Sequence, residues 1–494
     1  MVSSDKPTPS PRRPALWEAL LPVVALIVFL GLTLGVLRLD GERLGDPHIP
    51  LLLGCAIAAL MGARLGWDWD SLQEGMVRGI SLGMSSILIL LCIGILIGLW
   101  IAAGIVPLLI ELGLQLLHPS FFLPATCLIC AVVSVTTGSS WTTAGTVGVA
   151  LIGVGELLGV SAPMAAGAII SGAYFGDKMS PLSDTTNLAP AVAGSELFEH
   201  IRHMAWTTVP SFLLALLLFS FLGTGGEPLS GPGHLSEFRN HLQSHYRLSP
   251  WLWLAPALVV FLILRKVPAL PALLAGAAAG GVLAWALQGQ SLAAVLDIAM
   301  NGYRSTTGSA AVDDLLSRGG MTSMFWTVAL ILCALAFGGL MERTDMLEVL
   351  AEGILRLARR VGGLIAATIF TCIGMNAVAP DQYLSIVVPG RMYKTAFSRM
   401  RLHPKNLSRV LEDAGTLTSP LILWNTCGAT MFEVLGVSAF LYWRYCFFNL
   451  INPFVSLIYG LTGFKITPFE PSSSGTYPED SSDSSTSNRS PHSA

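Results

Sequence analysis

Long apolar segments follow one another along the chain, separated by short polar stretches. One runs from Trp17 to Leu37, and another, SAPMAAGAIISGAYF, occupies 161–175. Segments of roughly 20 apolar residues with little charge are typical of membrane-spanning helices. The composition agrees, because 12% of the 494 residues are charged, against about 25% in soluble proteins. The sequence therefore predicts an all-α polytopic membrane protein surrounded mainly by the lipid bilayer.

Four polar interruptions break this apolar pattern, two in each half of the chain. They are TTGSSWTT (136–143), GDKMSPLSDTTN (176–187), GMNAVAPDQ (374–382) and EDAGTLTSPLILWNTCG (412–428). An amphipathic segment precedes each pair, at 105–120 and at 341–362. The counterparts lie roughly 220 to 240 residues apart in the same order, which indicates a duplicated chain.

The distribution of positive charge in the loops predicts the orientation. We place the N-terminus in the cytoplasm and interpret 121–158 and 363–390 as hairpins that enter and leave on one side. The cytoplasmic side then holds 20 of the 28 Lys and Arg residues and the outer side seven, with Lys178 inside the membrane. The two halves become opposite in orientation. This predicts an inverted repeat of about five transmembrane helices plus one re-entrant hairpin per half, with unwound helices at the midplane.

The predicted organisation of the chain follows from this arrangement. Ser, Asp and Pro dominate the last residues, which cannot build a core. The predicted divisions are a disordered cytoplasmic N-terminus at 1–14, a first transmembrane repeat at 15–222, an extracytoplasmic linker at 223–249, a second, inverted repeat at 250–464 and a disordered cytoplasmic tail at 465–494.

The interruption at 176–187 is a candidate binding site. Non-helical backbone survives at membrane depth only inside protein or beside a water-filled cavity, and Pro181 favours a break there. A carboxylate in a membrane is costly unless it is paired, protonated or holding a cation. Oxygen-only shells suit hard cations, so we expect Na⁺ at Asp184, Asp177, Thr185 and Asn187, with Ser183 and Thr186 as further neutral oxygens.

The second half offers a matching set of polar residues. Asn376 and Asp381 lie in the interruption at 374–382, and the later one contributes Asp413, Asn425 and Thr426. Structural roles are the alternatives: Lys178 could neutralise Asp177 or Asp184, and Asp413 could pair with a basic residue of the adjacent loop. Buried hydroxyls also commonly join membrane helices.

Other functional classes lack support in the sequence. There is no Walker motif for ATP hydrolysis, no haem, flavin or iron–sulfur signature, and no basic patch with aromatics for nucleic acid. We therefore expect a secondary transporter rather than an enzyme, with no cofactor besides the transported ions. A membrane scaffold or sensor is the alternative, but it would not need four polar interruptions.

Several of these stretches resemble the NhaC-type Na⁺/H⁺ antiporters of the ion-transporter superfamily. The similarity covers roughly 15–465 and includes SGAYFGDKMSPLSDTTNLAPAVAGSELFEHIRHM, TGSSWTTAGTVGVALIGVG and NAVAPDQYLSIVVPGRM. The resemblance implies export of Na⁺ in exchange for H⁺ across a bacterial inner membrane, by a homodimer with an elevator-like movement. It also implies a binding site at Asp177, Asp184, Thr185, Thr186, Asn187, Ser139, Ser140, Thr142, Asn376, Asp381 and Asn425.

The resemblance leaves the substrate open. NhaC-like proteins include exchangers of organic acids, such as malate for lactate, and of amino acids, coupled to Na⁺ or H⁺. An organic anion would favour a spare positive group in the site, which Lys178 could supply. One residue departs from the family pattern: Leu423 stands before Trp424 where we expect proline, which predicts a gentler second helix break.

Overall fold

The computed structural model describes residues 11–33, 38–39, 42–43, 47–222, 240–308, 310–356 and 358–469. The rest of the predicted tails and linker (1–10, 470–494 and 223–239) lies outside the described residues. Among the described residues the fold is helical except for a two-residue antiparallel ladder, β1 (Arg38–Leu39) with β2 (Glu42–Arg43). The prediction of an all-α polytopic membrane protein is confirmed.

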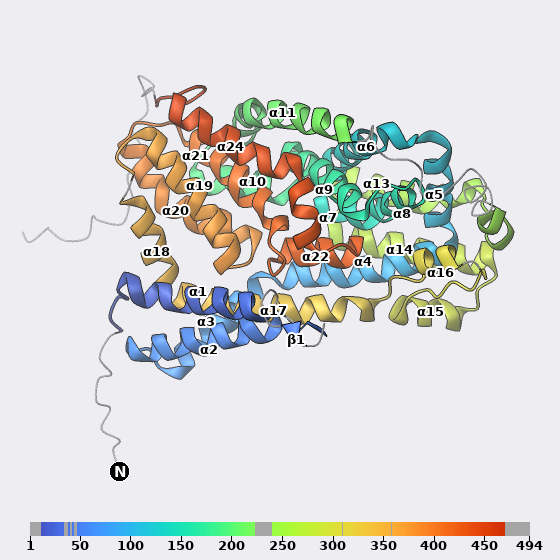
Figure 1. The fold of residues 1–494 in the computed structure, drawn as a ribbon, viewed down its shortest axis with the longest axis horizontal. Coiled ribbons are helices and arrows are strands. Elements are labelled where there is room, and N and C mark those ends of the chain that lie inside the picture. The colour runs from blue at the N-terminus through green and yellow to red at the C-terminus, as the bar shows by residue number, and fades with distance from the viewer. Residues whose placement is uncertain are drawn as a thin grey trace, which may run out of the picture.

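The N-terminal helices pack together along one side of the molecule (Figure 1). They are α1 (Leu16–Gly31), α2 (His48–Arg64) and α3 (Trp69–Leu82). Asp68 caps α3 by accepting a hydrogen bond from the amide of Ser71 at 2.7 Å. Glycines make close approach to a later helix possible, because a Cβ on Gly79 would lie 2.4 Å from the carbonyl oxygen of Leu335.

The first half continues through a long helix, a short helix and a hairpin. These elements are α4 (Met84–Ala103), α5 (Ile105–Leu116), η2 (Pro119–Phe121), α6 (Phe122–Thr137), α7 (Ser140–Thr143), the π-helix η3 (Ala144–Gly148) and α8 (Val149–Leu157). The chain reverses at Gly138, whose φ of +68° favours glycine. The two arms end close together, since a Cβ on Gly155 would lie 3.0 Å from the ring of Phe122. The chain thus doubles back within 121–158, while its re-entry on one side of the membrane stays a prediction, because 119–137 is itself long and apolar enough to span.

Three further helices complete this half. They are α9 (Ala162–Met179), α10 (Asp184–Ala193) and α11 (Leu197–Leu222). Helix α9 packs along α6 through glycines, because a Cβ on Gly172 would lie 2.0 Å from the carbonyl oxygen of Cys127. The polar break between α9 and α10 is thereby fixed next to the tip of the hairpin.

The second half begins with helices at the end of the molecule where α5 lies (Figure 1). They are η5 (Pro250–Trp253), α13 (Leu254–Leu264), α14 (Ala269–Gln288), α15 (Leu292–Asn301), α16 (Ala310–Leu316) and η6 (Met321–Met324). Helix α14 packs along α4, and Trp100 Nε1 donates to the carbonyl of Gly276 at 3.0 Å. The segment before η5 contacts α5, because Gln243 Nε2 donates to Glu111 Oε1 at 2.6 Å.

The remaining helices repeat the order of the first half. They are α17 (Phe325–Arg343), α18 (Met346–Leu355), α19 (Val361–Val378), α20 (Gln382–Arg399), α21 (Pro404–Leu411), the π-helix η7 (Glu412–Thr416), η8 (Ser419–Leu421), α22 (Thr426–Leu435), α23 (Ala439–Tyr442), η9 (Trp443–Tyr445) and α24 (Phe447–Thr462). Helices α19 and α20 form the predicted second hairpin, joined by Thr371 Oγ1 and Tyr393 Oη 2.6 Å apart. The short helices α5 and α18 lie at opposite ends of the molecule (Figure 1).

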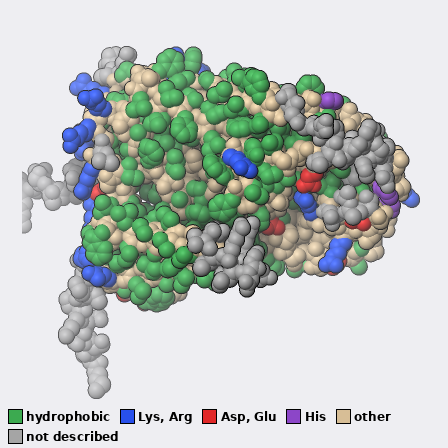
Figure 2. Space-filling model, viewed as in Figure 1, with side chains coloured by type: hydrophobic (Ala, Val, Ile, Leu, Met, Phe, Trp, Pro, Cys, Tyr) green, Lys and Arg blue, Asp and Glu red, His purple; other side chains and the backbone are tan. Residues whose placement is uncertain are grey.

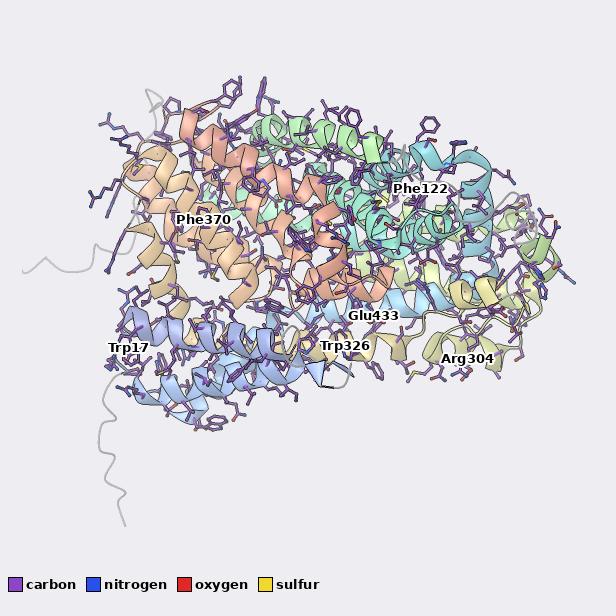
Figure 3. All side chains as sticks on the ribbon, in the orientation of Figure 1. Trp17, Phe122, Arg304, Trp326, Phe370 and Glu433 are labelled. Atoms are coloured by element: carbon purple, nitrogen blue, oxygen red, sulfur yellow. The ribbon has the colours of Figure 1, made fainter. Side chains whose placement is uncertain are left out.

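Helix α17 connects the N-terminal helices to α22. The ring of Trp326 packs against Phe432 with centroids 5.5 Å apart, and Thr327 Oγ1 donates to Glu433 Oε2 at 3.1 Å. Figure 3 shows Trp326 and Glu433 near each other between these two helices. Glu433 is therefore an intramembrane carboxylate with a hydrogen-bond partner.

Within the described residues, six helices are long and apolar enough to cross a membrane. The α23–η9 segment and α24, which meet at a bend of 59°, would make a seventh span. Figure 2 shows apolar side chains over the middle of the molecule and Lys and Arg at both ends, with more of them at the left end. The protein is therefore multi-pass, while five spans per half stay a prediction.

Candidate functional site

The first broken helix is interrupted over a shorter stretch than the sequence predicts. Helix α9 ends at Met179, and α10 begins at Asp184, so only 180–183 lie outside helix. Ser183 ends the interruption early by capping α10, because its Oγ accepts from the amide of Thr186 at 3.4 Å. Asp177 and Asp184 therefore flank the break instead of lying within an unwound segment.

Asp177 is bound by the tip of the first hairpin. Its Oδ2 accepts hydrogen bonds from the hydroxyl of Ser140 at 2.7 Å and from the Ser140 amide at 3.2 Å. The side chain is 7% exposed. Ser139 caps α7 by accepting from the amide of Thr142 at 3.2 Å. Gly138 touches the break itself, because a Cβ there would lie 2.7 Å from the Cβ of Leu182.

The hydroxyl and amide residues that follow the break mostly stabilise its backbone. Thr186 Oγ1 donates to the carbonyl of Lys178 at 3.0 Å, and Asn187 Nδ2 donates to the carbonyls of Pro181 at 2.9 Å and Ser183 at 2.7 Å. Thr185 Oγ1 and Ser183 Oγ lie 3.2 Å apart. The bonds to Lys178 and Pro181 give partners to carbonyls at the break, where the helical bonding pattern is interrupted.

The polar residues of the second half form a buried amide network. Asn425 Nδ2 donates to both the carbonyl and the Oδ1 of Asn376 at 3.1 Å. Asn376 Nδ2 in turn donates to the carbonyl of Gly415 at 2.7 Å. Asp381 caps α20 by accepting from the amides of Tyr383 at 2.9 Å and Leu384 at 3.2 Å. Thr426 Oγ1 donates to Asp381 Oδ2 at 3.5 Å, which joins the two interruptions.

The second break is complete despite the leucine at 423. The chain leaves helical geometry at Ile422 (φ −111°, ψ 116°) and resumes as α22 after Asn425. Asn425 Oδ1 caps this helix by accepting from the amide of Cys427 at 3.0 Å. The capping asparagine therefore suffices where the family pattern has proline, and the expected gentler break is not observed.

Lys178 joins the first break to the second. It forms an ion pair with Asp413, and its Nζ also donates to Asn452 Oδ1 at 3.3 Å. Thr207 Oγ1 donates to the same Asp413 oxygen at 3.0 Å. Both charged side chains are 0% exposed. The partner of Lys178 is thus neither Asp177 nor Asp184, and its ammonium is unavailable to an organic anion in the cavity.

One cavity of about 510 Å³ brings the two halves together. Its wall includes the first hairpin, both sides of the first break, the start of α4, the α13–α14 loop and the start of α20. Seven of the predicted site residues line it: Ser139, Ser140, Asp177, Ser183, Asp184, Thr185 and Thr426. The others lie outside the wall: Thr142, Thr186, Asn187, Asn376, Asp381, Asp413 and Asn425.

Gln382, which the sequence offers beside Asn376 and Asp381, also lines the wall, and two further cavity residues were not expected. Tyr383 Oη donates to Asp184 Oδ2 at 3.4 Å. Lys266 enters from the loop between α13 and α14, where it adopts a φ of +61°. The sequence gives only a weak signal for Lys266, because a basic residue at a predicted cytoplasmic helix end is common.

Broken helices that surround a polar cavity between membrane-spanning helices define a secondary transporter. The chain belongs to the Na⁺/H⁺ antiporter family, because the sequence model of that family matches residues 17–173 and 172–464. The chain functions as a transporter and not as an enzyme.

Several curated proteins are similar over nearly their full length. The Na⁺/H⁺ antiporter NhaC of Alkalihalophilus pseudofirmus is 42% identical over 85% of this chain and 91% of its own. The arginine/ornithine antiporter ArcD of Halobacterium salinarum is 38% identical over 96% of both chains. The malate-2H⁺/Na⁺-lactate antiporter of Bacillus subtilis is 36% identical over 92% of this chain and 96% of its own.

Among solved structures, MtrF of Neisseria gonorrhoeae, described with a class of antimetabolite efflux pumps, covers 90% of this chain and 95% of its own. The sequence identity is 11% and the TM-score 0.39. Similarity at this level carries no argument about the present chain.

Proposed function

We propose that this protein exports Na⁺ in exchange for H⁺ across a bacterial inner membrane. The observation that carries the proposal is the convergence of Asp177, Asp184 and neutral oxygens from both halves on one cavity. Carboxylates with hydroxyl oxygens suit Na⁺, and a membrane carboxylate can exchange a cation for a proton. The similarity to the NhaC antiporter of Alkalihalophilus pseudofirmus supports the same function.

The proposed cycle uses the carboxylates of the first break. Na⁺ binds at Asp184, with Asp177, Thr185 and Asn187 as the other expected ligands, and is released on the opposite side when protons replace it. Asp184 is exposed to the cavity, so it can take Na⁺ from water, whereas Asp177 is held by Ser140. Movement of the helices around the breaks exposes the binding site to the outer side and to the inner side in turn.

The orientation and assembly belong to the same proposal. Two inverted repeats place α5 and α18 at opposite ends, which is the arrangement in Figure 1. The larger share of Lys and Arg at the left end in Figure 2 supports cytoplasmic termini. The family resemblance supports a homodimer with an elevator-like movement, which cross-linking in native membranes would test.

Purified protein in proteoliposomes tests the exchange. An imposed pH gradient should drive uptake of labelled Na⁺, and Asp184→Asn should lower that rate at least about tenfold. Asp297→Asn is the matched control, because Asp297 is exposed on α15 and lies outside the cavity wall. Full activity of folded Asp184→Asn would remove Asp184 from the cycle, and no Na⁺ flux in the wild type would overturn the proposal.

A second candidate function is exchange of an organic acid or amino acid coupled to Na⁺ or H⁺. A cavity of about 510 Å³ exceeds what Na⁺ needs, and Lys266 supplies a positive group opposite the carboxylates. The relatives named for arginine and ornithine and for malate and lactate align with more than 90% of this chain, at 38% and 36% identity. Competition of these four solutes with labelled Na⁺ uptake separates the candidates, since a Na⁺/H⁺ exchanger is insensitive to them.

A further inference from the structure

A buried carboxylate outside the cavity has no assigned role. Glu412 is 0% exposed and begins the π-helix η7. Neither of its carboxylate oxygens has a hydrogen-bond partner among the described residues. It does not line the cavity. Buried carboxylates are costly unless they are protonated or something compensates their charge, so in its charged form this group needs a partner beyond those that the described residues supply.

The cations nearby are engaged elsewhere. Lys178 is paired with Asp413, and Arg409 Nε lies 3.9 Å from Asp413 Oδ2. Arg409 Nη1 is directed at His203 Nε2, 3.1 Å away, and donates to the carbonyl of Lys465 at 3.0 Å. No Lys or Arg nitrogen lies within 4.0 Å of Glu412 in the described part of the chain. Lys178 and Arg409 thus have other partners, and Glu412 has no ion pair among the described residues.

The charge balance of the cluster shows what is missing. Asp177, Glu412 and Asp413 supply three carboxylates, and Lys178 and Arg409 supply two cations, which leaves one negative charge. The other titratable side chains on α9 and on the elements packed against η7 are Tyr174, Asp184, Glu199, His200, Arg202, His203, Cys372, Tyr383, Arg391, Tyr393, Lys394, Arg399, Lys405 and Tyr459. A single monovalent cation would neutralise the five buried charged side chains counted above.

The neighbours of Glu412 are oxygen donors of the kind a hard cation takes. Thr416 follows Glu412 by four residues in the same π-helix, and α10, which begins with Asp184 and Thr185, packs against η7. Thr416 is 0% exposed, and its Oγ1 also has no partner among the described residues. The π-helix shifts the backbone bonding pattern and commonly marks functional sites. Two unpartnered carboxylate oxygens and an unpartnered hydroxyl thus lie together.

We propose that Glu412, Thr416 and Thr185 bind a second Na⁺, separate from the Na⁺ at Asp184. This inference rests on the proposed Na⁺ transport and extends it to two cation positions. The shared neighbour Thr185 lies at the start of α10, between the cavity and η7. Occupancy of the second position would therefore hold α10 against η7 across the two halves.

Binding of labelled Na⁺ to the purified full-length protein tests the proposal. The wild type should bind two Na⁺ per chain, Glu412→Gln one, and Glu412→Gln combined with Asp184→Asn none. Glu433→Gln is the matched control, because Glu433 is an intramembrane carboxylate that already has Thr327 as a partner. It should bind two.

A second variant keeps the test decisive if Glu412→Gln does not fold. Thr416→Val preserves shape and removes a hydroxyl that has no partner in the protein, so folding should be unaffected. Its affinity for the second Na⁺ should fall about tenfold. Thr126→Val is the control, since Thr126 Oγ1 is equally buried and unpartnered but lies on α6.

The outcomes distinguish this inference from the proposed function. No Na⁺ binding by the wild type would overturn both. One Na⁺ in the wild type, lost in Asp184→Asn and retained with equal affinity in Thr416→Val, would overturn the second site alone. Proton release on Na⁺ binding that falls in Glu412→Gln, with two Na⁺ still bound, would show that Glu412 holds a proton and would also overturn it.

Discussion

The two broken helices differ in how they meet water. At the first break Asp184 and Asn187 are exposed, and Asp177 reaches the cavity wall. At the second, Asn376, Asn425 and Asp413 are fully buried, and the two asparagines bind each other. Similar polar sequences have therefore produced one open and one closed site. The difference arises from what covers each break, since the first faces the α13–α14 loop across a cavity.

Breaking the ion pair between the two sites should have the largest effect on stability. Lys178→Met leaves Asp413 buried without its closest cation and should lower the free energy of unfolding by about 3–5 kcal/mol. Detergent-induced unfolding of the purified protein measures this. Glu74→Gln, which removes the exposed pair of Arg343 with Glu74, should cost no more than about 1 kcal/mol. Equal losses would show that the two breaks are not coupled through Lys178.

A substitution at the buried second break should lower the free energy of unfolding more than a substitution at the exposed first break. Asn425→Ala leaves the Oδ1 of Asn376 without its donor and should cost about 1–3 kcal/mol. Ser183→Ala removes a long capping bond, 3.4 Å, and a contact with the Thr185 hydroxyl, 3.2 Å, and should cost about 1 kcal/mol. The same unfolding measurement compares them. A larger loss for Ser183→Ala would contradict the contrast between the sites.

The contact between the first hairpin and its break can be tested by substituting Gly138 at the hairpin tip. Gly138→Ala must accept a positive φ, at about 1–2 kcal/mol, and would also place its Cβ 2.8 Å from the backbone carbon of Leu182. Gly289→Ala has the same strain at φ +72° but no neighbour within 4 Å. Na⁺ uptake in proteoliposomes should fall in the first variant and stay near wild type in the second. Matching rates would mean that the tip can move freely away from the break.

The smallest effect on stability is expected at Asp313, a carboxylate that lies outside both breaks. Asp313 accepts hydrogen bonds from Ser305, Thr307 and Gly308, which lower its pKa to about 2. Because the folded pKa is lowered, these bonds stabilise the protein above the ordinary pKa of aspartate, about 3.9, and the contribution is lost as the pH falls toward 2. Asp313→Asn should therefore differ slightly from wild type in melting temperature at pH 7, and the difference should shrink in acid. A difference that grows in acid would contradict this assignment.

The positions of the breaks and hairpins could be predicted because local chemistry determines them. Gly138 supports the first reversal, and Ser183 and Asn425 cap the helices that restart. The length of the first break was overestimated, since polar residues such as Thr186 and Asn187 are helical and bond back to the interruption.

Long-range pairing could not be predicted from the same patterns. Lys178 pairs with Asp413, 235 positions away, although two aspartates stand closer in sequence. Lys266 reaches the cavity because α13 and α14 return along α4, which depends on helix packing rather than on the residues around Lys266. Glu412 lies beside a predicted site residue, but its lack of a partner is visible only once every neighbour is placed.

The second hairpin tip is fastened to its break by two bonds to main-chain carbonyls, in addition to the bonds of Asn425 and Thr426 to Asn376 and Asp381. Trp424 Nε1 donates to Ala377 at 2.8 Å, and the Thr426 amide donates to Pro380 at 3.0 Å. Each such bond contributes about 0.5–1.5 kcal/mol net. Separating this tip breaks all of these bonds together and so costs several kcal/mol, which makes the second hairpin a firmly anchored wall of the transporter.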